Sequence, residues 1–177
     1  MIVFETKFKE VMLDEKNAFS NFVLSALVGA SPLLGTAAYQ YHKTHPTSIS
    51  QSAENASGQP QGNLPRGLRN NNPGNIEKSK DTWLGAVGND GRFLKFKTPE
   101  YGARAMARII KNYQKNYGVD TIEKIIHRWA PPSDNNPTTK YVNYVSRLSG
   151  FPKDQKLDLT QETTLLKIMD AMIKFEN

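Results

Sequence analysis

Glu176, close to the end of the sequence, is the carboxylate whose position most strongly indicates chemistry. Leu165, Met169, Met172 and Glu176 fall at i, i+4, i+7 and i+11, so they share one stripe of a helix that is apolar except for its last member. The negative end of the helix dipole and the apolar neighbours would both favour a protonated carboxyl group. Such a group suits general-acid cleavage of a glycosidic bond. The alternative is a solvated chain end, because terminal residues fray.

The stretch RGLRNNNPGNI, from Arg66 to Ile76, is unusually rich in side-chain amides, which belong to Asn70, Asn71, Asn72 and Asn75. Pro73 and Gly74 exclude a long helix or a central strand, so a polar turn is the simplest interpretation. A turn needs only one or two such residues, however, so turn formation does not explain the remaining asparagines. Amide groups donate and accept hydrogen bonds, which suits contact with the hydroxyl and acetamido groups of a glycan.

Other carboxylates are candidates for a second catalytic group, and each also has a structural explanation. Glu100 falls in the first turn of a predicted helix, where the dipole favours an acid. Asp90 lies in the turn GNDG, and Asp134 lies in a loop where it could brace the next helix. Glu77 follows the amide stretch directly and is a candidate for substrate binding, as are the aromatic residues Trp83 and Tyr141.

The composition excludes several kinds of site. The sequence has no cysteine, which rules out a disulfide scaffold, a thiol nucleophile and a cysteine-based zinc site. Its three histidines do not form a paired metal-binding motif. We therefore predict neither a metal site nor a cofactor.

The elements that must position these residues are predicted in residues 64–177. Gly88 to Gly91 separates two apolar runs, which indicates a β-hairpin. Thr98 and Pro99 begin a helix that Gly118 ends, and one of its faces is predicted to run from Gly102 to Tyr117. Three further helices are predicted in the segments DTIEKIIHRWAPP, NPTTKYVNYVSRLSG and DLTQETTLLKIMDAMIKFEN. The fold class is therefore α+β and mainly helical, with a small hairpin and about four helices.

Residues 1–63 differ in composition from the rest. Residues 17–41 contain no charged side chain, which is about the length that crosses a bilayer. We predict a leader and membrane anchor in residues 1–41, with a signal peptide or a buried helical hairpin broken at Pro32 as alternatives. Residues 42–63 are polar and are predicted to be a flexible linker.

The charge of the chain is concentrated in its second part. The whole sequence carries 23 basic and 17 acidic residues, for a net charge of +6. Residues 1–63 hold four of the basic and five of the acidic residues, so residues 64–177 have a net charge of +7. An anionic partner is therefore predicted: nucleic acid, lipid head groups or a bacterial cell-wall polymer.

Several motifs together resemble a family of phage and prophage proteins that degrade cell walls, virion structural proteins with a lysozyme-like or lytic-transglycosylase-like domain. The motifs are RGLRNNNPGNI, W-x-G, F-x-x-F-x-T-P-E-x-G-x-R-A, NYQKNYGVDTIEKIIHRWAPPSDN and AMIKFEN, and the resemblance covers about residues 65–177. The family's glutamate matches Glu176. This chain departs from the family pattern at Phe175 in place of histidine, at Glu77 in place of arginine and at Asp134 in place of glutamate.

The resemblance implies a lysozyme-like muralytic domain in residues 64–177, in which Glu176 cleaves the bond between N-acetylmuramic acid and N-acetylglucosamine. Because the ends of a domain often lie close together, the amides of the Arg66–Ile76 stretch would face the glycan or brace the loop beside Glu176. The implied setting is a virion, with peptidoglycan and other virion proteins as partners. The anchor predicted from the composition of residues 17–41 would associate the protein with a membrane.

Three alternatives concern function. Glu176 could act with a second carboxylate, as in a muramidase, or alone, as in a lytic transglycosylase. The domain could instead be a non-catalytic structural or peptidoglycan-binding virion protein, because a fold does not establish an activity. A nucleic-acid-binding domain is less well supported, since no recognition motif is present and acids are interspersed among the bases.

Overall fold

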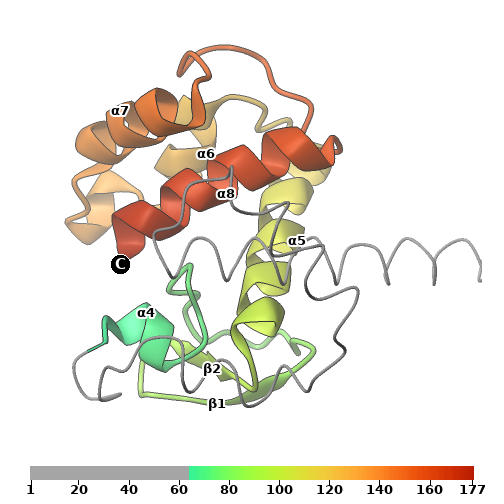
Figure 1. Ribbon diagram of the computed structural model, residues 1–177, viewed down its shortest axis with the longest axis vertical. Helices are drawn as coiled ribbons and strands as arrows, with labels where there is room; N and C mark the ends of the chain where they lie inside the picture. Colours follow the sequence, from blue (N-terminus) through green and yellow to red (C-terminus); the bar gives the residue numbers. More distant parts are fainter. Residues whose placement is uncertain (1–63) are drawn as a thin grey trace, which may run out of the picture. The chain divides into compact units, whose positions relative to one another are not determined.

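Helices and one small hairpin make up residues 64–177, the part of the chain that the computed structural model describes (Figure 1). Its elements are α4 (Arg66–Arg69), β1 (Ala86–Asn89), β2 (Leu94–Phe96), α5 (Pro99–Tyr117), α6 (Ile122–Trp129), the 3-10 helix η3 (Pro132–Asp134), α7 (Thr138–Ser149) and α8 (Glu162–Glu176). The mixed helix and strand architecture predicted from the sequence is confirmed. The predictions of an anchor in residues 1–41 and of a linker in residues 42–63 lie outside the described residues.

The compact unit that contains these elements runs from Pro65 to Asn177. Within it, α7 packs against α6 and α8, and α5 contacts both α8 and β2. Among residues 64–177, no helix combines the length and the apolar character needed to cross a membrane.

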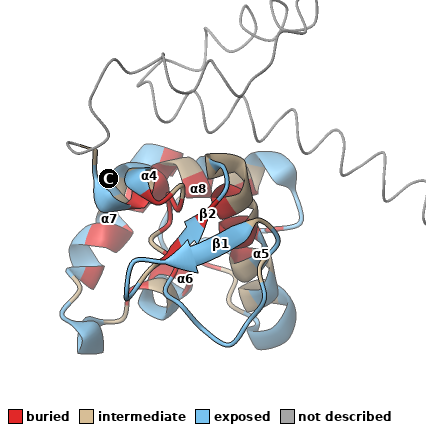
Figure 2. Ribbon diagram, turned by 90° about the horizontal axis from the view of Figure 1, so that it is seen from below, coloured by how far each residue is buried: buried red, intermediate tan, exposed pale blue. Residues whose placement is uncertain are grey.

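The hairpin forms where the sequence predicts it. β1 and β2 are antiparallel, with Ala86 opposite Phe96 and Asn89 opposite Leu94, and an irregularity in the register follows Ala86. Leu94 and Phe96 alternate inward toward the core, while every residue of β1 is exposed (Figure 2). The alternation of buried and exposed side chains that is typical of a strand therefore holds for β2, which also contacts α5.

The bounds of α5 follow from its terminal residues. Thr98 has an extended backbone before the first helical residue, Pro99, and Gly118 ends the helix with φ of 63°. Met106 and Ile110 are fully buried on the inner face. The prediction that Tyr117 continues this face is wrong: its side chain is 62% exposed, and the guanidinium of Arg128 lies 3.8 Å from its ring centroid.

The remaining helices supply the core. Thr121 accepts a hydrogen bond from the Lys124 backbone N–H and caps α6, whose isoleucines are fully buried. α7 ends at Gly150, which has φ of 79°. In α8, Leu165, Met169 and Met172 are buried, so the predicted apolar stripe is confirmed.

One short helix was not expected. α4 forms at the start of the amide stretch and ends at Asn70, before Pro73 can interrupt it. The chain then turns through Asn71 and Asn75, which have φ of 52° and 49°. This left-handed backbone is uncommon outside glycine, but asparagine tolerates it better than most residues. The segment Asn70–Ile76, which follows α4, is called the amide loop below.

The amide loop lies directly against α5. A Cβ atom added to Gly102 would overlap the carbonyl oxygen of Asn71 and would come within 2.9 Å of Pro73 Cδ. Gly74 packs in the same way on Met106 and Trp129. The first turns of α5 therefore form a surface on which the loop rests without space for another carbon atom.

Gly102→Ala should destabilise the domain by about 1–3 kcal/mol, because the new methyl group overfills this contact. Alanine normally stabilises a helix by about 1 kcal/mol relative to glycine, so a lower free energy of unfolding would have to come from the contact between this position and the amide loop. Urea unfolding followed by circular dichroism measures the change. Asn112→Ala, at an exposed position of the same helix, is the control and should be neutral or stabilising; a stabilising Gly102→Ala would show that the loop is free to move away.

Candidate active site

Glu176 ends α8 beside the amide loop, and both of its carboxylate oxygens accept hydrogen bonds. The hydroxyl group of Tyr141, on α7, donates to Oε1 at 3.0 Å. The Nδ2 group of Asn75 donates to Oε2 at 3.0 Å. Figure 1 shows the end of α8 facing the α4 segment. Three segments that are distant in sequence thus meet at one partly buried carboxylate.

Asn177 joins the same two segments by a second set of contacts. Its Nδ2 group donates to the carbonyl oxygens of Pro73 at 2.9 Å and Ile173 at 3.0 Å. A Cβ atom on Gly67 would lie 2.6 Å from Asn177 Oδ1 and 2.9 Å from Asn75 Oδ1. Glycine at this position therefore allows α4 to approach the end of α8 closely.

Two amides of the loop are used for bracing. Asn72 is fully buried, and its Nδ2 group donates to the carbonyl oxygens of Ile76 and Leu94 at 2.9 and 3.0 Å, while its Oδ1 accepts from the Ile76 backbone N–H. The Nδ2 group of Asn71 donates to the carbonyl oxygens of Phe96 and Lys97 at 3.0 and 3.2 Å. These side-chain bonds add to the backbone hydrogen bonds of the loop, and the Asn72 amide supplies the partner of the Ile76 N–H group.

Asn75 has a different role, because it points to Glu176 rather than to the backbone. Its Oδ1 atom is buried and has no hydrogen-bond partner within residues 64–177. An unpartnered buried amide oxygen is energetically unfavourable and is a feature that functional sites retain more readily than structural loops. Asn75 is therefore the loop amide placed most directly in the candidate site.

Two further aromatic rings belong to this region: that of Phe175 contacts Tyr141, and that of Tyr144 contacts Phe175. The ring of Phe175 stacks on Tyr141 with centroids 3.9 Å apart and an interplanar angle of 13°. Tyr144, one turn further along α7, meets Phe175 edge-on at 5.4 Å. Desolvation raises the pKa of Tyr141 well above its usual value, and the neighbouring charge of Glu176 and their hydrogen bond raise it further. Tyr141 therefore remains a hydrogen-bond donor to Glu176 at neutral pH.

Tyr144 and Phe175 were not identified as site residues from the sequence. The spacing of Tyr141 and Tyr144 places both on one side of α7, which was an available signal. No sequence pattern predicted the hydrogen bond from Tyr141 to Glu176, because it forms between two helices that meet only in the folded domain.

Asp90 lies in the hairpin turn and is held by several donors. Its Oδ1 accepts from the backbone N–H groups of Phe93 at 2.9 Å and Arg92 at 3.2 Å. Its Oδ2 accepts from Asn70 Nδ2 at 2.7 Å and lies 3.3 Å from Arg66 Nε. The hydrogen bond from Phe93 and then that from Asn70 hold the pKa of Asp90 well below its usual range. These contacts connect the turn to the opposite end of the amide stretch from Asn75.

The other candidates have no direct polar contact with Glu176 in the part of the chain that the structure describes. Glu77 is exposed and forms an ion pair with Arg92, whose Nη2 atom is 2.6 Å from Oε1. Asp134, in η3, accepts a hydrogen bond from Ser133 at 3.2 Å. Glu100 lies in the first turn of α5, and Trp83 precedes the hairpin. Among residues 64–177, no hydrogen bond or ion pair joins any of these side chains to Glu176.

Comparison with known proteins places the chain in a family of phage proteins. It is 40% identical over 153 residues to Protein P5 of Pseudoalteromonas phage PM2, and the alignment covers 84% of this chain and 86% of that protein. The chain therefore belongs to the family of this phage protein. No protein-family model matches the chain.

Tyr141→Phe should lower the free energy of unfolding by about 1–3 kcal/mol at neutral pH, because a hydrogen bond to the Glu176 carboxylate is lost while the ring stays packed. The difference should shrink above about pH 10, where tyrosine ionises in unfolded chains. The pKa of Tyr141 is raised in the folded state, so the stability it contributes is complete below pH 10 and is lost as the pH rises further.

Urea unfolding at pH 7, 9 and 11 measures this effect in the parent and in Tyr141→Phe. Tyr144→Phe is the control, because it leaves the bond between Tyr141 and Glu176 in place. A difference between parent and Tyr141→Phe that does not change with pH would show that the hydroxyl group is not buried against the carboxylate.

Proposed function

We propose that the protein is a virion-associated peptidoglycan-degrading enzyme that cleaves the β-1,4 bond between N-acetylmuramic acid and N-acetylglucosamine. The observation that carries the proposal is the carboxylate of Glu176, held between Tyr141 and Asn75 where a polar loop meets the end of a helix. Membership in a family of phage proteins supports a role in the virion. A phage must pass the cell wall of its host, so a wall-degrading enzyme suits this setting.

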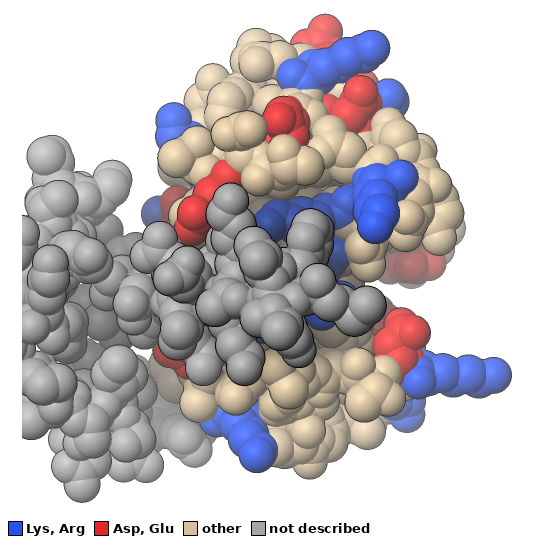
Figure 3. Space-filling model, turned by 90° about the vertical axis from the view of Figure 1, so that its right-hand side faces the viewer, with Lys and Arg blue, Asp and Glu red and all other residues tan. Residues whose placement is uncertain are grey.

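The charge of the domain agrees with an anionic wall polymer as substrate. Residues 64–177 have a net charge of +7. On the face drawn in Figure 3, lysine and arginine side chains are spread over both the helical and the hairpin parts, with acidic groups between them. A distributed positive field increases the local concentration of an anionic polymer without requiring one fixed binding groove.

In the proposed reaction, the protonated carboxyl group of Glu176 gives its proton to the glycosidic oxygen as the bond from that oxygen to C1 breaks. Positive charge then develops at C1 and the ring oxygen of the muramic acid. The Glu176 carboxylate next takes the proton of the hydroxyl group that attacks C1. Tyr141 and Asn75 fix the direction of the carboxyl group during both steps, since each contacts a different oxygen.

The attacking hydroxyl group is proposed to be the C6 hydroxyl of the muramic acid itself, as in a lytic transglycosylase. Retaining hydrolases use a second carboxylate about 5 Å from the acid, and inverting hydrolases use one at a longer separation. Asp90 is already engaged by Asn70, Arg66 and the turn backbone. Glu77 is engaged by Arg92, and Asp134 belongs to an exposed 3-10 helix. A route that needs one carboxyl group therefore fits better than a muramidase route.

Residues 17–41 are proposed to anchor the enzyme in a membrane and residues 42–63 to give the domain reach, so that it acts on the wall beside that membrane. Other virion proteins are proposed partners in the particle.

A non-catalytic virion protein is the second candidate, and one observation favours it. Both oxygens of Glu176 already have partners inside the domain, so the role of this residue could be purely structural, holding the amide loop, α7 and α8 together. A structural or peptidoglycan-binding protein would need these hydrogen bonds for stability and would not need Glu176 to transfer a proton.

Glu176→Gln separates these two functions. Glutamine keeps the size of the side chain, and Asn75 can rotate its amide so that Oδ1, which lacks a partner in residues 64–177, accepts from the new amide. The unfolding midpoint should therefore change little. Loss of the transferable proton should lower wall clearing by at least about 100-fold. Clearing assays on purified walls give the rate, and Asp134→Asn is the control; clearing at the parental rate would leave only the structural role.

The chemical nature of the released fragments distinguishes the two enzymatic routes. Mass spectrometry of purified peptidoglycan treated with the full chain should find muramic acid ends that are lighter by one water molecule, as an internal C6 ether requires. Ordinary reducing ends would instead indicate hydrolysis, and cleaved peptides with intact glycan strands would contradict both routes.

A further inference from the structure

A pocket lies on the hairpin side of the domain, and Glu176 is not among the residues that line it. Its volume is about 590 Å³, which is within the usual range for sites of small ligands. The segment 78–83 forms one side, and Ala86, Gly88 and Asn89 of β1 with Leu94 of β2 form the other. None of its lining residues forms a hydrogen bond with Glu176.

The polar lining of this hairpin pocket favours an anionic ligand. Lys78 and Lys80 are exposed, and neither forms an ion pair within residues 64–177. Asp81 is the acidic residue of the lining, and it is engaged locally: Ser79 Oγ donates to its Oδ2 at 3.0 Å and accepts from its backbone N–H at 3.1 Å. Two cations are therefore available to an incoming ligand, while the carboxylate is held in a turn.

Trp83 gives the pocket an apolar wall. Its side chain is half-buried, and its Nε1 group is buried with no acceptor among the described residues. Indole N–H groups are usually paired when buried, so an unpaired Nε1 group is an unusual feature of this side chain. Ala86 and Leu94 add apolar atoms to the lining. The site thus combines the positive charge of Lys78 and Lys80 with the apolar surface of Trp83, Ala86 and Leu94.

We propose that the hairpin pocket binds the peptide stem that peptidoglycan carries, through the free carboxylates and the small aliphatic side chains of the stem. The proposal rests on peptidoglycan being the substrate. A glycan strand without its stems offers one lactyl carboxylate on each muramic acid and no aliphatic side chains, whereas a stem with several free carboxylates can engage both lysines while its aliphatic side chains contact the face of Trp83. The Glu176 site would then hold the glycan, and the hairpin pocket would select strands that still carry their peptides.

Binding is measured with the full chain carrying Glu176→Gln, so that the ligand is not consumed. The probes are a muramyl disaccharide with a tetrapeptide stem, the same compound with its carboxylates amidated, and the disaccharide without peptide. Calorimetry gives the affinity, and tryptophan fluorescence reports contact with Trp83. We expect the acidic tetrapeptide compound to bind more tightly than the other two and to lose its fluorescence response in Trp83→Phe.

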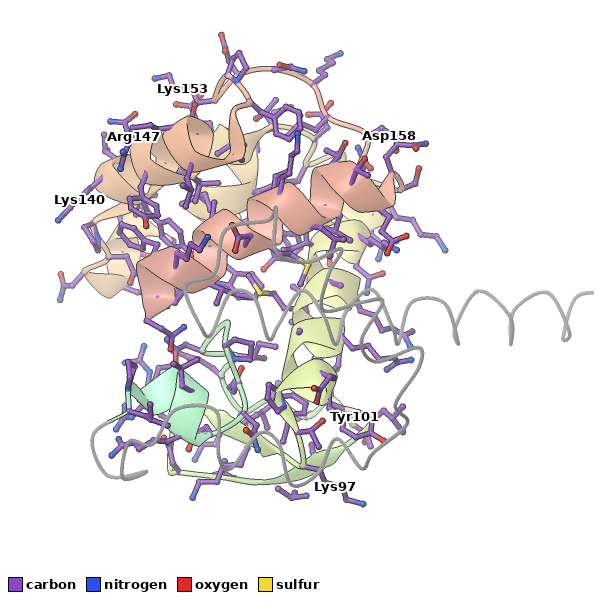
Figure 4. The ribbon with its side chains drawn as sticks, viewed as in Figure 1. Lys97, Tyr101, Lys140, Arg147, Lys153 and Asp158 are labelled. Carbon is purple, nitrogen blue, oxygen red and sulfur yellow. The ribbon has the colours of Figure 1, made fainter. Side chains whose placement is uncertain are left out.

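Replacing both Lys78 and Lys80 with alanine should weaken binding of the acidic compound by about 3- to 30-fold, as expected for two exposed ion pairs. Lys153→Ala with Lys156→Ala is the matched control and should leave binding unchanged. Figure 4 shows Lys153 beside α7, at the other end of the domain from Lys97 and Tyr101, which mark the hairpin end.

Equal affinity for the three probes, or undiminished binding after loss of Lys78 and Lys80, would overturn the proposal. Binding to vesicles of anionic phospholipid that depends on these lysines, without binding of the acidic compound, would also overturn it and would assign the surface to a membrane. The outcome is independent of catalysis: binding that depends on the lysines, in a parent chain that releases no wall fragments, would support the pocket and reject the enzymatic function.

Discussion

The apolar packing of α8 is the interaction on which the rest of the domain depends. Asn75 and Glu176 are 101 residues apart in the sequence, so the bond between them requires that a long loop be closed. A hydrogen bond contributes only about 0.5–1.5 kcal/mol net, or somewhat more with a charged partner, which is too little for this purpose. Each fully buried Leu, Ile or Met side chain contributes about 1.5–3 kcal/mol. Leu165, Ile168, Met169 and Met172 therefore place the end of the helix, and the polar groups then set the direction of the carboxylate.

The amide loop shows how an irregular segment can be made rigid without secondary structure. Its backbone has two left-handed asparagines, and the backbone N–H groups of Asn70, Asn71, Asn72 and Asn75 donate to backbone carbonyl oxygens. The side-chain amides of Asn71 and Asn72 add further hydrogen bonds to the loop and to β2. Asn70 holds the hairpin turn through Asp90, and Asn72 holds β2 through Leu94. The density of amides in the sequence is thus explained largely by bracing, and one amide, that of Asn75, is left directed at Glu176.

Local sequence signals predicted the elements of this fold well. Thr98, Pro99, Gly118 and Gly150 mark helix ends, and the stripe in α8 gave the buried face of that helix, because capping and periodicity act over a few residues. Tyr117 was predicted inward from the same periodicity, but at the last turn of α5 the partner is Arg128 rather than the core. The short helix α4 was missed because Pro73 and Gly74 dominate the pattern of the stretch.

The candidate site was predictable only in part. Glu176 and Asn75 were both selected from their own sequence surroundings, yet their direct contact depends on how the whole domain closes. The pairing of Tyr141 with Glu176 and its stacking on Phe175 are tertiary contacts between two helices, which no local pattern encodes. Asp90 was selected because it lies in a turn, and two of its four donors belong to that turn. The other two, Asn70 and Arg66, could be identified only from the folded domain, in which α4 lies near the hairpin.

The sulfur atoms of the core have a chemical consequence. Met106, Met169 and Met172 are fully buried, and Met106 lies against Gly74 of the amide loop. While the domain is closed, oxidants in solution cannot reach these thioethers; each opening of the loop or of α8 exposes them. A sulfoxide formed at that moment would bring a polar oxygen into a space that has no partner for it and would hinder closure. Because the chain has no cysteine to react first, the amount of sulfoxide at these methionines would increase with the frequency at which the domain opens.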